Sequence, residues 1–297
     1  MASIACGKVL EAKEGKIGMY RIIEKQLLAP GTQFMRIDAP LIARKAMPGQ
    51  FIILRIMEGG ERIPLTIADY NRQEGWISII FQEVGNTTKA LGQLETGDFI
   101  KDFVGPLGKA SELDEYNKVL CIGGGVGTAP LYPQIKYFHD HEKSVDVIIG
   151  ARNKDYIVLE QQISGICDNL YIATDDGSQG HKGFVTDILK RLVAEGNTYD
   201  HVIAIGPLIM MKVVSGITKE LGLPTTVSMN PIMVDGTGMC GGCRVTVGGK
   251  VQYACVDGPD FDGHQVDFDE AMRRQQMYKA EEKIEHSCNL LTMGGER

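Results

Sequence analysis

Three cysteines in one glycine-rich stretch, VDGTGMCGGCRVTVGGKVQYAC at residues 234–255, have the type and spacing of metal ligands. Cys240 and Cys243 form a C-x2-C pair, and Cys255 follows after eleven further residues. Plant-type [2Fe–2S] sites have the spacing C-x4-C-x2-C with another cysteine at a distance. The stretch fits this spacing, with Asp235 in the position of the first cysteine. We therefore predict a [2Fe–2S] cluster bound by the three thiols.

The C-x2-C pair has two other interpretations. It could be half of a zinc site, but the sequence has no second C-x-x-C and no H-x-x-H. It could be a redox dithiol, which normally lies at a strand-to-helix turn, whereas this stretch is typical of a loop that leads into a strand. Asp235 is the first choice for the fourth cluster ligand, and Cys288 and Asp257 are the alternatives. Glycines let a loop wrap closely around a cluster, and this loop contains Gly236, Gly238, Gly241 and Gly242.

Two glycine-containing turns follow apolar runs that are typical of buried strands. GGGVGTAP at residues 123–130 follows KVLCI, and GPLIMMK at residues 206–212 follows HVIAI. Glycines let the backbone approach a pyrophosphate, and the free N–H groups of a helix start favour an anion. The first turn could instead be a tight connection without a ligand, and the second an ordinary helix start with Met210 and Met211 in the core. Strand ends converge on one crevice in open α/β sheets, so the two turns together predict a nucleotide site.

Two segments in the first third of the chain carry residue types that bind phosphate. ERIPLTIADY places Arg62 beside an extended segment, and an arginine offers a forked contact to phosphate. VGNTTKAL is typical of a helix start after Gly85, with Thr87 or Thr88 as the N-cap. A capped helix start is an anion site. The alternatives are an ordinary exposed strand and a capped helix that binds nothing.

The pattern of predicted secondary structure changes near Lys118. Before it, short runs bounded by Pro, Gly and Asn predict strands of an antiparallel barrel or sandwich at residues 20–28, 32–39, 50–57 and 76–84. After it, strands at 118–124, 145–151, 169–175 and 201–207 alternate with helical segments at 129–141, 158–166, 184–195 and 208–222, which indicates a parallel α/β sheet. We expect four parts: a barrel (1–112), an α/β domain (113–225), a cluster domain (226–266) and a C-terminal helix (267–297).

The composition argues against several classes of function. The chain has 31 Lys and Arg against 38 Asp and Glu, a net charge of −7, and no block of like charge, so no nucleic-acid or membrane-surface partner is expected. No apolar run reaches the ~18 residues that a membrane span needs, and the N-terminus lacks the apolar stretch of a secretory signal. Seven cysteines without such a signal predict a reducing, cytoplasmic location.

Five motifs occur in an order that resembles the ferredoxin–NADP reductase superfamily. They are R-x-P-L-T, G-x-T-T, GGGVGTAP, GPLIMMK and the cysteine loop. Within it, essentially the whole chain is similar to two groups of electron-transfer subunits. One belongs to NAD-dependent dihydroorotate dehydrogenase. The other is the small subunit of NADH-dependent reduced ferredoxin:NADP oxidoreductase, also called sulfide dehydrogenase. The first group typically has cysteine in the first cluster position and the second has aspartate, so Asp235 points to the second.

The resemblance implies FAD in the barrel and a nicotinamide nucleotide in the α/β domain. The implied flavin contacts are Arg62, Pro64, Leu65 and Thr66, with Gly85, Thr87 and Thr88 at the pyrophosphate. The implied NAD(H) contacts are Gly124, Gly125, Val126, Gly127, Thr128, Asp175, Asp176, Gly177, Gly206 and Met210. No side chain is expected to act as a catalytic acid or base, because the cofactors carry the chemistry.

The function expected from this resemblance is an electron relay. Electrons would pass between NADH, FAD, the cluster and a larger flavin/iron–sulfur partner subunit, with ferredoxin as a further candidate partner and electron bifurcation as a candidate activity. The alternatives are the electron-transfer subunit of dihydroorotate dehydrogenase and a non-enzymatic redox sensor. NADH is expected rather than NADPH. A charged helix over residues 268–287 is expected to dock on a partner or on the cluster loop, because such a helix is marginal alone.

Overall fold

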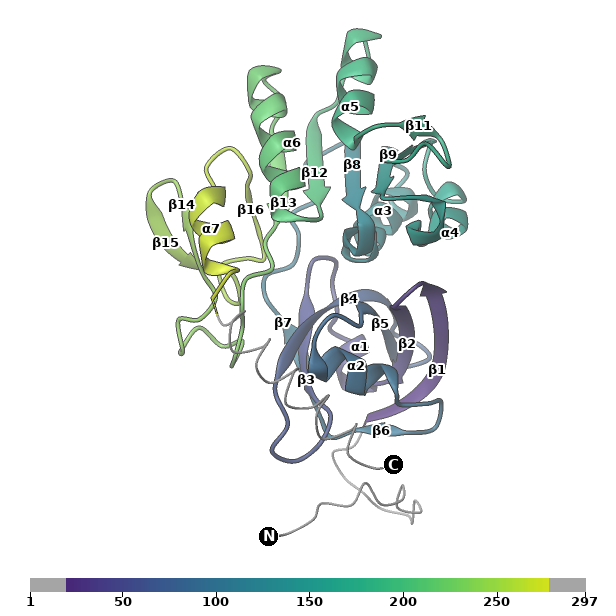
Figure 1. The fold of residues 1–297 in the computed structure, drawn as a ribbon, viewed down its shortest axis with the longest axis vertical. Coiled ribbons are helices and arrows are strands. Elements are labelled where there is room, and N and C mark those ends of the chain that lie inside the picture. Colours follow the sequence, from purple (N-terminus) through teal and green to yellow (C-terminus); the bar gives the residue numbers. More distant parts are fainter. Residues whose placement is uncertain (1–19, 278–297) are drawn as a thin grey trace, which may run out of the picture.

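The computed structural model describes residues 20–277 in three parts, a barrel, an α/β sheet and a small hairpin region (Figure 1). Within these residues, no helix combines the length and the apolar character that a membrane crossing requires. The boundaries expected at residues 112, 225 and 266 stay predictions.

The barrel is one antiparallel sheet in the order β6-β1-β2-β5-β4-β3-β7. Its apolar side chains, such as Met35, Ile52 and Phe81, point inward and are fully or almost fully buried. The predicted antiparallel barrel is therefore confirmed. Its elements are β1 (Tyr20–Ala29), β2 (Thr32–Asp38), α1 (Pro40–Ala43), β3 (Phe51–Arg55), β4 (Ile63–Asn71), β5 (Trp76–Gln82), α2 (Asn86–Gly92), β6 (Phe99–Ile100) and β7 (Asp102–Leu107).

The second sheet has the order β11-β10-β9-β8-β12-β13-β16 and is parallel except for β16. Its central strands are apolar on both faces, as expected for strands covered by helices on both sides. The predicted parallel α/β sheet is confirmed. Its elements are β8 (Lys118–Gly124), η1 (Gly125–Gly127), α3 (Thr128–Asp140), β9 (Ser144–Ala151), η2 (Lys154–Tyr156), α4 (Glu160–Ser164), β10 (Asn169–Thr174), β11 (His181–Lys182), α5 (Val185–Ala194), β12 (His201–Ile205), α6 (Leu208–Glu220), β13 (Thr225–Ser228) and β16 (Asp260–Asp262).

Alternate residues of β8 show which helices cover each face. Cys121 packs in a core with Ile135 of α3 and Ile163 of α4. Leu120 points the other way, into a core with α5 and α6. The period of two along the strand thus assigns α3 and α4 to one face and α5 and α6 to the other.

The hairpin of β14 (Arg244–Val247) and β15 (Lys250–Tyr253) follows the cysteine-rich loop, and α7 (Phe268–Arg274) follows β16. The predicted C-terminal helix begins at Phe268 as expected, but it ends at Arg274 and passes into a turn. The rest of the predicted helix, from residue 278, lies outside the described residues.

All three parts share packed contacts. Phe51 and Ile53 of the barrel belong to the same buried cluster as Val227 of the sheet and Val245 of the hairpin. A second cluster joins the barrel residues Ala68 and Ile80 to Ala129 of α3, and Lys136 of α3 pairs with Asp69 of β4 at 2.9 Å. The barrel therefore packs against α3 at one place, and with the hairpin region and the edge of the α/β sheet at another.

Candidate functional site

The β14–β15 hairpin brings two of the three predicted cysteine ligands together. Cys243 directly precedes β14 and Cys255 follows β15, and Ala254 N donates to Cys243 O at 3.1 Å. Their sulfurs are 3.2 Å apart, and both side chains are 2% exposed. Burial, followed by the neighbouring sulfur of Cys243, raises the pKa of Cys255 to about 12. Cys243 Sγ donates to Cys255 Sγ, so the pair is held as protonated thiols. A bound iron would displace these protons and take both sulfurs as thiolate ligands.

The third cysteine lies beside Asp235. Asp235 Oδ2 accepts from Cys240 N at 2.9 Å, and its Oδ1 accepts from Thr237 N at 2.8 Å. These N–H groups, that of Thr237 first, hold the pKa of the Asp235 carboxyl below its usual range. The side chains of Cys240 and Thr237 also hydrogen-bond to this carboxylate. The loop is thus folded around a charged carboxylate next to Cys240.

The four predicted ligands form two pairs, Asp235 with Cys240 and Cys243 with Cys255. Among residues 20–277, no three His, Cys, Asp or Glu side chains lie close enough to hold a single metal ion. Two pairs suit two irons, so the donor set fits a binuclear cluster better than a mononuclear ion. The alternative ligand Asp257 accepts from Tyr253 N at 2.8 Å. The other alternative, the cysteine at position 288, lies outside the described residues.

The two glycine turns of the predicted nucleotide site touch each other at the carboxyl edge of the sheet. A Cβ at Gly127 would lie 2.4 Å from Ile205 O and 2.7 Å from the Cα of Gly206. A Cβ at Gly124 would lie 2.4 Å from the sulfur of Met210. Four of the implied contacts, Gly124, Gly127, Gly206 and Met210, therefore have a packing role, which the sequence alone left open.

The same turn also leaves room for a ligand. Gly125 has a φ of +55°, and no atom lies within 4 Å of the Cβ that another residue would place there. The Thr128 hydroxyl at the start of α3 is buried and has no hydrogen-bond partner among residues 20–277. An open backbone and an unpaired hydroxyl at a helix start fit an anionic ligand. Val126 points elsewhere, because it packs against the barrel with Ala129.

Asp175, Asp176 and Gly177 follow β10, two strands away from β8, at the same edge of the sheet. Both carboxylates are exposed, and Asp176 Oδ1 accepts from Ser178 N at 2.9 Å. The side chain and backbone of Ser178 hold the pKa of Asp176 below its usual range. The predicted NAD(H) residues therefore lie along one edge, as the strand-end argument requires.

The implied flavin residues lie on the barrel. Pro64, Leu65 and Thr66 are half-buried in β4, and Arg62 precedes the strand and is exposed. Thr87 in the first turn of α2 donates to the carboxylate of Glu61. This contact joins the two implied flavin segments, and it places an anionic oxygen where a pyrophosphate oxygen would be expected.

The predicted N-cap of α2 is wrong by two or three residues. The helix begins at Asn86 with Gly85 as its N-cap, so Thr87 and Thr88 lie inside the first turn. Thr88 Oγ1 accepts from Gly85 N at 3.0 Å and donates to Gly85 O at 3.1 Å. Gly85 takes the cap position because the hydroxyl three residues later satisfies the backbone around it.

The cluster loop rests directly on the barrel. Gly236 has a φ of +74°, and a Cβ there would lie 2.5 Å from Cδ1 of Ile53 and 3.0 Å from Cδ1 of Leu107. Ile53 in β3 is the register partner of Pro64 in β4. The loop that carries Asp235 therefore lies one strand away from the implied flavin segment. No sequence pattern predicted this contact, because its two sides are far apart in the chain.

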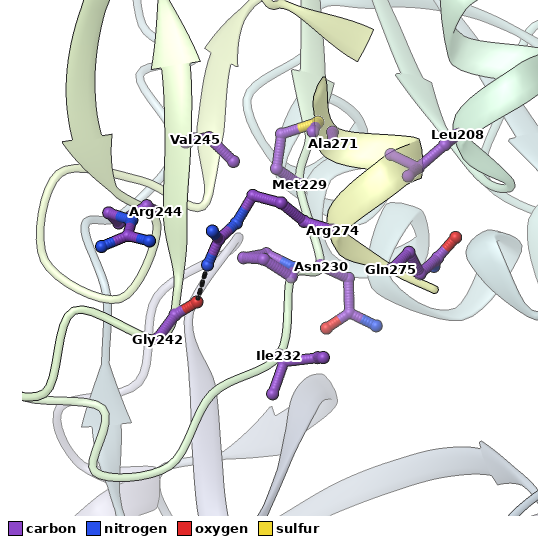
Figure 2. A pocket seen from close by; sticks show the side chains of 11 residues that line it. Leu208, Met229, Asn230, Ile232, Gly242, Arg244, Val245, Ala271, Arg274 and Gln275 are labelled. Atoms are coloured by element: carbon purple, nitrogen blue, oxygen red, sulfur yellow. Dashed lines mark hydrogen bonds between the residues drawn. The ribbon is translucent and has the colours of Figure 1, made fainter. Parts of the chain in front are cut away.

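A contact with the cluster loop also comes from α7, and the sequence did not identify the residue that makes it. Arg274 Nη2 donates to the carbonyl oxygen of Gly242, between the first two cysteines, at 3.0 Å. Figure 2 shows this side chain at the edge of a small pocket between α7 and the loop. The described part of the C-terminal segment thus docks on the cluster loop, one of the two expected places.

Two family models match parts of this chain. Residues 121–216 match the oxidoreductase NAD-binding domain, and residues 230–267 match the iron–sulfur cluster binding domain of dihydroorotate dehydrogenase B. The predicted nicotinamide-nucleotide and iron–sulfur domains are therefore confirmed.

Relatives match over nearly the whole length. A Thermotoga maritima homologue of the electron-transfer subunit of dihydroorotate dehydrogenase B (NAD(+)) is 45% identical over 280 residues, which cover 94% of this chain and 99% of the relative. The electron-transfer subunit of that enzyme from Desulforamulus reducens is 35% identical over 259 residues, covering 84% of this chain and 98% of the relative.

A solved structure is also similar throughout. It is that of NADH-dependent reduced ferredoxin-NADP oxidoreductase, studied for flavin-based electron bifurcation. Its matching chain is 44% identical, with a TM-score of 0.87, and the match covers 93% of this chain and 99% of that one. The whole-chain resemblance expected from the sequence is confirmed. The chain belongs to the family of oxidoreductase electron-transfer subunits formed by those of dihydroorotate dehydrogenase B and their homologues.

Proposed function

We propose that this chain is the small, electron-transferring subunit of an NADH-dependent ferredoxin:NADP oxidoreductase. It would exchange electrons with NAD(H) and with a larger flavin/iron–sulfur partner subunit, and ferredoxin and NADP would be used by the complex. Two observations support this choice within the family. The chain is 44% identical to a subunit of such an enzyme, and Asp235 stands in the first position of the cluster motif. A reducing cytoplasm, which keeps the thiols of the cluster loop free, is the proposed compartment.

The contact of Gly236 with Ile53 carries the proposal of an electron relay. Strands in a sheet are about 4.8 Å apart, and Ile53 pairs with Pro64 of the implied flavin segment. Bound FAD would accept a hydride from NADH and release single electrons, which a [2Fe–2S] cluster can carry. The chain's own residues fix how far apart these groups lie, because a glycine at position 236 lets the cluster loop touch the barrel.

Each implied segment has a binding role in this proposal. Arg62 and the first turn of α2 would hold the FAD pyrophosphate, with Thr87 exchanging its contact to Glu61 for a phosphate oxygen. The half-buried β4 residues Pro64, Leu65 and Thr66 would lie against the flavin ring.

The edge of the α/β sheet would take the nicotinamide nucleotide. Gly125 and Thr128 would face its pyrophosphate, because this backbone is open and this hydroxyl is unpaired. The two carboxylates after β10 would lie toward the adenosine, where an aspartate can accept from ribose hydroxyls.

The cluster would be held by Cys240 and Asp235 on one iron and by Cys243 and Cys255 on the other. A carboxylate oxygen is a harder donor than a thiolate, and ligand type is one determinant of the reduction potential. We expect Asp235→Cys to keep the cluster but to shift its potential and its EPR spectrum. Asp235→Ala should lose the cluster or make it labile while FAD stays bound. An unchanged EPR signal in Asp235→Ala, with cluster loss in Cys288→Ala, would assign the fourth position to the tail cysteine.

The choice of activity is tested on the complex purified with its natural partner. We expect ferredoxin- and NADP-dependent turnover with NADH, and no reduction coupled to dihydroorotate. Turnover with dihydroorotate alone would favour the second candidate, which the 35% identical Desulforamulus reducens subunit supports. Rapid bleaching of the flavin absorbance by NADH alone is expected in either case. A flavin that NADH does not reduce would favour the redox-sensor alternative and refute both enzyme assignments.

A further inference from the structure

α7 is a short helix whose position is fixed by contacts on both sides. Asp267 N donates to Thr246 O of β14 at 2.8 Å, and Phe268 is buried in the core that contains Cys243. On the other side, Asp269 pairs with Lys212 of α6 at 2.7 Å. These contacts place the last turn of α7 beside the cluster loop.

Arg274, the last residue of α7, reaches a peptide group inside the C-x2-C pair. Its Nη2 donates to Gly242 O at 3.0 Å, and the Gly242 N–H donates to the sulfur of Cys240 at 3.5 Å. The arginine is half-buried, and it lies across the small pocket from Ile232 and Asn230 (Figure 2). Gly242 is thus held by a ligand sulfur through its N–H and by a guanidinium through its carbonyl.

We propose that Arg274 is a positioning residue that holds the cluster loop at Gly242 and raises the reduction potential of the cluster through its charge. This inference rests on the proposed cluster site. Reduction adds one electron, and hence one negative charge, to a cluster. A nearby cation stabilises the reduced form relative to the oxidised form. Arginine suits this role because its side chain stays protonated at all relevant pH values and its planar fork donates in a fixed direction.

Two features separate this role from general helix packing. The match to the iron–sulfur binding domain ends at residue 267, so α7 lies outside the segment that the family model covers. Hydrogen bonds and charges just beyond the ligands tune a metal site, and the half-buried position of the guanidinium limits the screening of its charge by solvent. Arg274 therefore adds a positive charge to a loop whose proposed ligands are all anionic.

Arg273 provides a matched control in the same turn of α7. It carries the same charge but is exposed. It lies near Asp269, whose pKa is held below its usual range by Lys212 first and also by Arg273. Removing this arginine changes the net charge of the protein by the same amount without touching the Gly242 carbonyl.

The experiment is an anaerobic redox titration of the intact complex, followed by the EPR signal of the reduced [2Fe–2S] cluster. We expect Arg274→Gln to lower the midpoint potential by an amount equal to about a tenfold change in the equilibrium constant, which is about 59 mV for one electron. Arg273→Gln should stay at the wild-type potential. Arg274→Lys keeps the positive charge, so its midpoint potential should stay near that of the wild type. The FAD content should be the same in all variants.

Equal midpoint potentials in Arg274→Gln and Arg273→Gln would overturn the proposal. If Arg274→Gln binds no cluster, the Arg274→Lys variant decides. A cluster at the wild-type midpoint potential in Arg274→Lys supports the role of the charge. Loss of the cluster in Arg274→Lys as well, or a midpoint potential shifted by the equivalent of a tenfold change in the equilibrium constant, overturns that role. A wild-type complex without any [2Fe–2S] signal would instead refute the proposed function, so the two failures are distinguishable.

Discussion

Replacing Gly127 by alanine tests whether the close contact between the two turns at the sheet edge requires a glycine at this position. Gly127 has φ −62° and ψ −15°, a conformation that alanine adopts without strain. The added Cβ would lie 2.4 Å from Ile205 O and 2.7 Å from the Cα of Gly206. Ordinary contacts of a Cβ begin near 3.4 Å, so backbone must move against backbone by about 1 Å. Overpacking of this kind costs about 1–3 kcal/mol.

The effect should appear both in stability and in nucleotide binding. A cost of this size lowers the melting temperature by roughly 2–4 °C for each kcal/mol. The added methyl group would push the Gly125–Gly127 turn away from Gly206. This turn contains Gly125 and leads into Thr128, so the predicted NADH site should be displaced with it. If the whole cost falls on the binding-competent arrangement, the apparent Kd for NADH rises about tenfold for each 1.4 kcal/mol. Thermal denaturation and stopped-flow reduction of the flavin by NADH measure the two effects.

Two other glycines provide controls. Gly216 lies inside α6 with no atom within 4 Å of its added Cβ, so Gly216→Ala should be neutral or stabilising by about 0.5–1 kcal/mol. At Gly124 the nearest atom is the sulfur of Met210, the flexible part of a side chain, so Gly124→Ala should have an intermediate effect. The reasoning is wrong if Gly127→Ala matches Gly216→Ala in both melting temperature and NADH affinity.

Three further predictions concern other parts of the chain. Burial lowers the pKa of His201 to about 4 from 6.5. The contribution of neutral His201 to the free energy of unfolding should therefore be fully present above pH 6.5 and fall by up to about 3 kcal/mol as the pH drops toward 4. In urea unfolding, the free energy of unfolding of His201→Gln should depend less on pH over this range. NADH should reduce the flavin faster and at lower concentration than NADPH, because Asp175 and Asp176 would repel a 2′-phosphate, and stopped-flow titration with both nucleotides checks this. Gly236→Ala should slow electron arrival at the cluster, and Ile53→Val, which removes the clashing Cδ1, should partly restore it.

Local patterns predicted the strands and helices that bury apolar side chains. The runs at β9 and β12 are rich in Val and Ile, and β12 and the five residues Val145–Ile149 of β9 are buried, so composition and length sufficed. In α5, the buried residues Val185, Ile188 and Leu192 follow the helical period. The strand β7 was not predicted, because it contains Gly105 and Pro106, which are typical of turns.

The cysteine spacing predicted the cluster loop because the site is almost contiguous in the chain. The hairpin between Cys243 and Cys255 closes the pair without help from distant segments. The contacts of Gly236 with Ile53 and of Arg274 with Gly242 join segments that are distant in sequence. No local periodicity encodes such contacts, since they depend on how separately formed parts pack together. The N-cap at Gly85 was missed for a different reason, because a glycine cap leaves no side-chain signal.

The strand order of the barrel relates the three predicted sites to one another. The sheet runs β5-β4-β3-β7 on this side. Ala68 of β4 and Ile80 of β5 pack against the start of α3, next to the nucleotide turn. Ile53 of β3 and Leu107 of β7 face Gly236 of the cluster loop. The implied flavin residues at the start of β4 lie between these two contacts. The proposed relay needs the order nucleotide, flavin, cluster. Neighbouring strands of the barrel contact the three predicted sites in this same order.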